Sequence, residues 1–329
     1  MTFQLLRRRL AAAVVVCAIA PAALAQSTPS YPTKPIRFVV GFTAGSATDV
    51  IARIVAEHVG KKLGQPVVVD NKTGANGMLA AGDVAASAPD GYTVLISNVS
   101  TITINPQLYK KVSYDVQRDF APVSLMVSFP FVLTVSGERK KPGSVGTLKD
   151  LIALARDNPG KVSYGSAGQG NLMHLSFERL NSMAGVTMLH VPYRGTPQAQ
   201  TAVMAEEVDA VLGPASLPLI RSGKLKALAV SSAQRWSELP DVPSVAELGY
   251  PDYDISAWTA ALVPSRTPPA VIKVLYEAIH SAAADPATRA QLSQQGAVLM
   301  LNPQQFASRI DQETQIYGEI IRKSNIQLD

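Results

Sequence analysis

The chain has 329 residues, with 30 Lys or Arg and 25 Asp or Glu, and a formal net charge of +5. The basic residues are scattered along the chain, which argues against a nucleic-acid-binding surface. A chain of this length exceeds the usual size of a single hydrophobic core, so we expect two domains.

The start of the chain has the composition of a secretory signal. Three Arg at positions 7–9 precede an uncharged run over residues 10–20, and Ala23 and Ala25 then form a small-residue cleavage pattern. We therefore predict a signal peptide over residues 1–25, cleaved after Ala25, and export to the periplasm. The single cysteine, Cys17, lies in this segment, so the exported chain is expected to contain no disulfide.

The first predicted strand leads into a loop suited to an anion. Residues 36–40 are largely apolar and β-branched, which is typical of a buried strand. Residues 43–47 are small, and Thr48 and Asp49 then open an amphipathic run with helical spacing. Backbone N–H groups at the start of a helix favour an anion, and the loop contains no Lys or Arg. The alternative is an ordinary connection between a strand and a helix.

Strand and helix signals then alternate, which predicts a mostly parallel sheet with helices on both faces. Further strands are predicted at residues 67–69, 92–96, 162–164, 188–191, 208–212 and 225–230. Further helices are predicted at residues 78–88, 148–156, 171–183, 196–206, 270–284, 287–295 and 303–323.

Two extended segments differ from this pattern. Residues 120–127 and 255–264 contain few helix signals and bracket the second block of alternating elements. A chain that crosses into a second domain and returns needs two such segments, so we interpret them as hinge crossings; the alternative is two ordinary strands. The expected domains are residues 26–127 with 256–329, and residues 128–255.

The residues that usually carry catalysis or bind metals show no matching pattern. The four His, at positions 58, 174, 190 and 280, lack metal-ligand spacing, so no metal site is expected. The residues around Ser166 do not have the G-x-S-x-G spacing of a nucleophile elbow. Neither G-x-G-x-x-G nor a P-loop occurs. We therefore expect no catalytic residue and no cofactor, which favours a solute-binding protein over an enzyme.

Small and polar loops follow three of the predicted strands. They cover residues 42–48, 97–100 and 165–171, and in open α/β sheets ligands bind at this edge. Amides from loops in two domains would bind a carboxylate without a salt bridge, with hydroxyl groups fixing its orientation. Asp49 either caps its helix or contacts the ligand. His174 either packs within its helix or approaches the ligand, and His190 is expected to be structural.

The chain resembles the Bug family, the TctC-like extracytoplasmic receptors of tripartite tricarboxylate transporters. The matching motifs follow in order over nearly the whole exported chain, at residues 31–37, 42–49, 63–69, 88–92, 104–106, 119–123, 164–168, 190–195, 223–230 and 239–243. The resemblance implies a periplasmic-binding-protein fold, type II-like, with two α/β domains, a ligand cleft between them and two hinge crossings. It also implies a small organic carboxylate as ligand and a membrane permease as partner; we expect a monomer.

The resemblance places ligand contacts on two walls of the cleft. The first wall is expected to contain Phe42, Ala44, Ser46, Thr48 and Asp49, with Ser97 and Ser100 as further candidates. The second wall is expected to contain Ser166, Ala167, Gly168 and Gln169.

Three segments depart from the family pattern. Residues 43–47 read Thr-Ala-Gly-Ser-Ala where Pro-Pro-Gly-Gly-Gly is usual, and residues 169–171 read Gln-Gly-Asn where Asn-Gly-Thr is common. Gly213 stands where an acidic or amide residue usually helps to read the far end of the ligand. Walls this neutral would leave extra ligand charges unpaired. We therefore predict a monocarboxylate or dicarboxylate, with an apolar or aromatic body, over citrate or an amino acid. The alternative functions are a receptor for a signalling partner and a secreted enzyme on the same scaffold.

Overall fold

The computed structural model describes residues 31–138, 145–214, 216–323 and 326. The predicted signal peptide lies outside the described residues. Within those ranges, no helix combines the length and the apolar character needed to cross a bilayer.

Strands and helices alternate through most of the chain. The strands are β1 (Ile36–Val40), β2 (Val67–Asn71), β3 (Thr93–Asn98), β4 (Phe120–Ser136), β5 (Ser163–Ser166), β6 (Leu189–Pro192), β7 (Ala210–Pro214), β8 (Leu225–Val230), β9 (Ser256–Pro264) and β10 (Ala297–Leu301). The longer helices are α1 (Ala47–Leu63), α2 (Met78–Ala85), α5 (Leu148–Asp157), α6 (Leu172–Ala184), α7 (Thr196–Met204), α9 (Pro269–Ser281), α10 (Pro286–Ser293) and α11 (Pro303–Lys323). Shorter turns of helix are η1 (Ala75–Gly77), η2 (Ser100–Ile104), α3 (Asn105–Leu108), α4 (Val116–Asp119) and α8 (Leu217–Arg221).

The strands run in the order β2-β1-β3-β9-β4-β7-β5-β6, with β10 and β8 also paired to β4. Strand β1 is parallel to β2 and β3, and β5 is parallel to β6 and β7. Every pairing of β4 and β9 is antiparallel. The prediction of a mixed α/β fold is confirmed, but the prediction of a mostly parallel sheet is wrong. A short buried apolar strand has the same sequence pattern whether its neighbour is parallel or antiparallel. The residues of the strand alone therefore do not show the direction of its partner.

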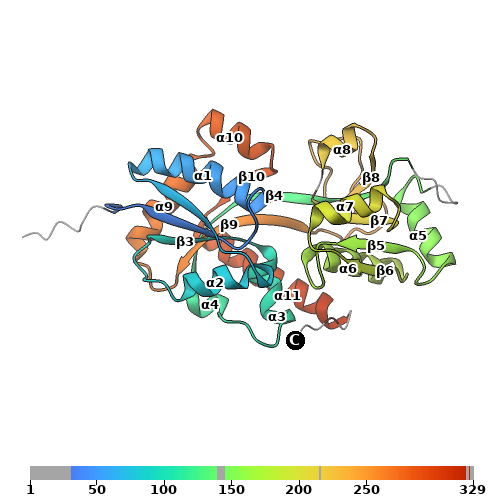
Figure 1. Cartoon of the computed structure of the whole chain (residues 1–329), viewed down its shortest axis with the longest axis horizontal. Helices are drawn as coiled ribbons and strands as arrows, with labels where there is room; N and C mark the ends of the chain where they lie inside the picture. The colour runs from blue at the N-terminus through green and yellow to red at the C-terminus, as the bar shows by residue number, and fades with distance from the viewer. Residues whose placement is uncertain (1–30, 139–144, 215, 324–325, 327–329) are drawn as a thin grey trace, which may run out of the picture.

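Strand β4 belongs to both halves of the molecule. Its residues from Phe120 to Pro130 pair with β9, and its residues from Phe131 onward pair with β7 and β8. Figure 1 shows β4 and β9 extending between two groups of elements, with α1 and α10 in one group and α5 and α7 in the other. The segment predicted as the first crossing, residues 120–127, is therefore the first half of a longer strand, and the change of partners comes after Pro130. The predicted domain boundaries remain a prediction.

The two segments that pass between these groups are joined through one buried serine. Ser231, which follows β8, is fully buried. Its N–H donates to Phe131 O at 2.9 Å, and its Oγ accepts from Phe131 N at 2.7 Å. Its carbonyl accepts from Ile255 N at 2.9 Å, and its Oγ donates to Ile255 O. Ser231 thus ties the middle of β4 to the residue that enters β9.

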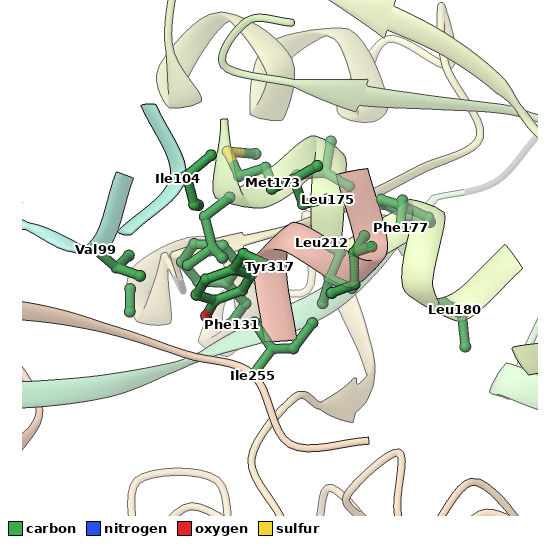
Figure 2. Packing of buried hydrophobic residues seen from close by; sticks show 14 of the residues in the cluster. Val99, Ile104, Phe131, Met173, Leu175, Phe177, Leu180, Leu212, Ile255 and Tyr317 are labelled. Carbon is green, nitrogen blue, oxygen red and sulfur yellow. The ribbon is translucent and has the colours of Figure 1, made fainter. Parts of the chain in front are cut away.

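Two hydrophobic clusters fill the interior. One packs α1, α9 and α10 against one face of the sheet formed by β1 and its neighbours. The other begins on the opposite face and continues into the second group of elements. Figure 2 shows Tyr317 of α11 close to Phe131, in one packed group with Ile104 on one side and Met173 on the other. Helix α11 contacts both β4 and α6, so it covers the junction between the two groups.

Strand β10 was not predicted from the sequence. Its five residues are apolar and lie between two predicted helices, where no element was predicted. The strand forms because β4 has a free edge there: Ala297 and Val298 pair with Ser128 and Val127. A five-residue apolar run carries no periodicity that separates a strand from a linker.

Ser231→Ala should lower the free energy of unfolding by about 1–3 kcal/mol, because the change leaves Phe131 N and Ile255 O buried without a partner. Urea denaturation would measure this change. Ser222→Ala is the matched control, since the exposed Ser222 hydroxyl donates only to the nearby Leu219 O. Equal stabilities of the two variants would contradict the structural role of Ser231.

Candidate functional site

The first loop runs from the carboxyl end of β1 to the start of α1. Ser46 caps the helix, because its side chain accepts from Asp49 N at 3.3 Å. The helix ends at Gly64, whose φ of 67° lies in the left-handed region. The amides of Ala47 and Thr48, at the first two helical positions, have no acceptor inside the helix. With the dipole of a 17-residue helix behind them, these amides favour an anion.

Asp49 is committed to holding this loop in shape. Its carboxylate accepts from Gly45 N at 2.9 Å, from Arg53 Nε at 3.0 Å and from Asn71 Nδ2 at 2.8 Å. Burial acts to raise the pKa of Asp49, but the hydrogen bonds from Arg53, Gly45 and Asn71 outweigh it and hold that pKa below its ordinary value. Of the two alternatives left open for Asp49, a helix cap or a ligand contact, the first does not hold. Ser46 occupies the cap position, since its side chain is the acceptor for the third amide of the helix.

The other residues predicted for the first wall differ in exposure. Phe42 is half-buried, and a Cβ built on Gly77 would lie 3.3 Å from its ring and 2.3 Å from Thr101 Oγ1. Phe42 thus packs against the turn before α2, where only glycine fits. Ala44 is exposed, and Thr48 is buried. Ser97 and Ser100 are also buried, at the end of β3 and in η2.

The second loop follows β5 and leads into α6. Ser166 is fully buried, and its Oγ donates to Gly168 O at 2.9 Å and accepts from Gly168 N at 3.2 Å. Gly168 and Gly170 have φ values of 132° and 73°, a region that other residues rarely adopt. Asn171 caps α6 by accepting from His174 N at 3.0 Å. The hydroxyl of Ser166 thus faces its own loop.

Ala167 and Gln169 complete the predicted second wall. Ala167 is half-buried and Gln169 is exposed. Both lie in the turn that precedes the first amides of α6, so the second loop repeats the arrangement found before α1.

Two histidines stack beneath the second loop. The rings of His174 and His190 are 3.8 Å apart and inclined by 10°, and Tyr164 stacks on His190 with a centroid distance of 5.1 Å. Burial, and secondarily the neighbouring His190, lowers the pKa of His174 to about 3. Burial lowers the pKa of His190 to about 4. Both imidazoles are therefore neutral near pH 7.

The contacts of the two histidines bear on the roles expected for them. His174 is 6% exposed, and its Nδ1 accepts from Gly170 N at 3.0 Å. This is the packed position expected for a residue within α6. His190 Nε2 lies 2.6 Å from Ser166 Oγ, so it contacts the loop through a side chain. The structural role expected for His190 is consistent with this contact.

Two residues that shape the first loop were not predicted from the sequence. Asn71, at the end of β2, donates to Phe42 O at 3.0 Å as well as to Asp49. Arg53 pairs with Asp49 and donates to Asn71 Oδ1 at 2.9 Å, which places a compensated positive charge behind the first loop. Asn71 is the last residue of β2, which runs parallel to β1, so its side chain lies at the same sheet edge as the first loop. A polar residue at the end of a predicted strand could therefore have been identified from the sequence as a candidate. Within the described residues, no hydrogen bond joins the first loop to the second.

Comparison with known proteins gives a consistent family. The family model described as "Tripartite tricarboxylate transporter family receptor" (TctC) matches residues 51–326. The chain is 35% identical to the protein BugT of Bordetella pertussis over 325 residues, which is 98% of each chain.

Solved structures of similar proteins carry small dicarboxylates. One, described as R. palustris Rpa4515 with adipate, is 31% identical, has a TM-score of 0.82, and aligns over 90% of this chain and 99% of its own. Another, described as MatC from Rhodopseudomonas palustris with bound malate, is 29% identical, has a TM-score of 0.78, and aligns over 88% of this chain and all of its own.

The free energy of unfolding should fall as the pH is lowered from 6.5 towards 4. In this window the unfolded chain protonates His174 and His190 at their ordinary pKa of 6.5, whereas the folded chain, with pKa values of about 3 and about 4, does not. The unfolded state therefore binds more protons and gains stability. Glu313 opposes this trend near its own titration, because burial raises its pKa.

Urea denaturation at a series of pH values would measure this slope. The double variant His174→Asn with His190→Gln should flatten it, whereas His280→Gln, at an exposed position, should leave it unchanged. A double variant with the slope of the original chain would show that other groups cause the loss of stability.

Proposed function

We propose that this chain, which belongs to the TctC family of receptors of tripartite tricarboxylate transporters, captures a small organic carboxylate in the periplasm and delivers it to a membrane permease. One observation carries the proposal. Two loops, after the parallel strands β1 and β5, each end at a side-chain-capped helix whose first amides are free of intrahelical partners. Such amides bind a carboxylate without needing a cationic side chain.

The ligand is proposed to lie between the two groups of elements seen in Figure 1. On one side it would meet the loop with Phe42, Ala44, Ser46 and Thr48, and on the other the turn 167–169. Asp49 and Ser166 would act indirectly, because their side chains already hold the loops. Residues 26–127 with 256–329 would form one domain, and residues 128–255 the other.

The charges around the loops favour a ligand of low charge. The carboxylate of Asp49 is compensated by Arg53, and the two histidines beneath the second loop are neutral. Burying an uncompensated charge costs several kcal/mol. A ligand with one or two carboxylates would therefore fit better than citrate, and the absence of an acidic side chain at Gly213 disfavours an amino-acid ammonium. The adipate and malate bound to the similar proteins are dicarboxylates and agree with this class.

A thermal-shift screen tests the ligand class. Hexanoate, adipate, malate, citrate and glutamate should be compared at equal concentration, with adipamide as the control that keeps the shape of adipate but removes both charges. We expect the melting temperature to rise with adipate, malate or hexanoate and to stay unchanged with adipamide. Stabilisation by citrate or glutamate alone would overturn the proposed ligand class.

Thr48→Val should weaken binding of the best ligand from that screen by about 1–3 kcal/mol if the Thr48 hydroxyl donates to the carboxylate. Valine keeps the volume of threonine, so the buried position stays filled. Thr43→Val, at an exposed position of the same loop, should change the affinity little. Calorimetry would measure both, and an unchanged dissociation constant for Thr48→Val would assign Thr48 a packing role only.

A further inference from the structure

The histidine pair beneath the second loop holds polar groups that ligand capture does not itself use. Imidazoles that only fill a core have no need to contact a loop. Here each ring contacts the loop 166–170 through a nitrogen: His174 through Gly170 N, and His190 through Ser166 Oγ. Ser166 Oγ in turn bonds both the N–H and the carbonyl of Gly168. The pair thus reaches three residues of the loop.

The loop needs such support because of its glycines. Gly168 and Gly170 adopt positive φ values, and glycine restricts the backbone less than any other residue. A loop of this kind samples several shapes unless other contacts fix one. The contacts to Gly168 and Gly170 act on the two residues with the most freedom.

The hydrogen bond from Gly170 N also determines which nitrogen of His174 carries the proton. Because Gly170 N–H donates to Nδ1, this nitrogen carries no proton, and the neutral ring carries its proton on Nε2. A doubly protonated ring has no acceptor and would lose the bond to Gly170. The single Ser166 hydroxyl proton goes to Gly168 O, so His190 Nε2 donates to Ser166 Oγ and carries the proton of the neutral ring.

We propose that His174 and His190 are positioning residues that hold the loop 166–170 in the shape that presents its other amides, and the first amides of α6, to the carboxylate, without contacting the ligand. The proposal rests on the proposed function of this loop. It assigns a role in ligand affinity to two side chains that lie behind the predicted ligand contacts.

The same row of stacked rings contains a residue that can serve as a matched control. Its replacement would disturb the packing without removing a hydrogen bond to the loop. Phe177 lies in the same row of rings, with its centroid 4.1 Å from that of Tyr164, and is fully buried. Its ring stacks on Tyr164, which separates it from the two histidines in the row. Phe177→Leu therefore loosens the core beside the histidines and leaves the bonds to Gly170 and Ser166 in place.

The experiment compares leucine variants with conservative ones. His174→Leu and His190→Leu remove the bonds to the loop and should weaken carboxylate binding by on the order of tenfold. His174→Asn keeps an acceptor near Nδ1, and His190→Gln keeps a polar group near Nε2, so both should stay within about threefold of the original affinity. Phe177→Leu should lower the melting temperature and leave the affinity unchanged. Equal losses in the leucine and conservative variants, or a loss in Phe177→Leu as large as in His174→Leu, would overturn the proposal.

A second readout works without any ligand. Amide hydrogen exchange of Gly170 in the full chain should be faster in His174→Leu than in the original chain and in Phe177→Leu. If the original chain binds none of the carboxylates, the proposed function fails, whereas this exchange still tests the contact to the loop. Faster exchange in His174→Leu with unchanged affinity would overturn the positioning role.

If the leucine variants do not fold, nitrogen NMR of the original chain tests the same point. His174 should show an unprotonated Nδ1 and a protonated Nε2 both before and after adipate is added. A change of the protonated nitrogen on adding adipate would mean that the ring takes part in the ligand contact and would overturn the proposal.

Discussion

The arrangement of the candidate site depends on one strand, β4, that belongs to both groups of elements. The first loop follows β1 and the second follows β5, and the path of pairing between these strands runs through β3, β9, β4 and β7. Any change in the course of β4 therefore moves one loop relative to the other. Ser231 fixes that course where the partners of β4 change, and α11 packs over the same junction.

A second constraint is the electrical neutrality of the loops. The carboxylate of Asp49 is compensated inside the protein by Arg53, and the two histidines beneath the second loop are neutral. Amides and hydroxyls then become the groups left to meet a ligand. Because helix N-termini supply partial charges on rigid backbone, they bind an anion without the desolvation cost of a buried lysine or arginine. This arrangement suits a receptor that must also release its ligand.

The first loop was predictable because its signals are local. The apolar run of β1, the small residues after it and the cap before α1 lie within about 15 residues of one another, and each has a distinct composition. The antiparallel pairings of β4 and the existence of β10 were not predictable. Both depend on partners far away in the chain, and a short apolar run has the same pattern in either direction. The sequence left open whether Asp49 caps α1, and the structure places Ser46 at that position; either residue type can serve as a cap.

The sequence by itself determined the alternation of strands and helices, the neutral loops and the resemblance to a receptor family, since all three are written in consecutive residues. The tertiary structure decided which polar side chains remain available to a ligand. Asp49 meets Asn71 across 22 residues and Ser166 meets His190 across 24, and each pairing makes the side chain a support of its loop. The residue type gives the hydrogen-bonding capacity of a side chain. Its actual partner depends on which strands the fold brings together at the same edge of the sheet.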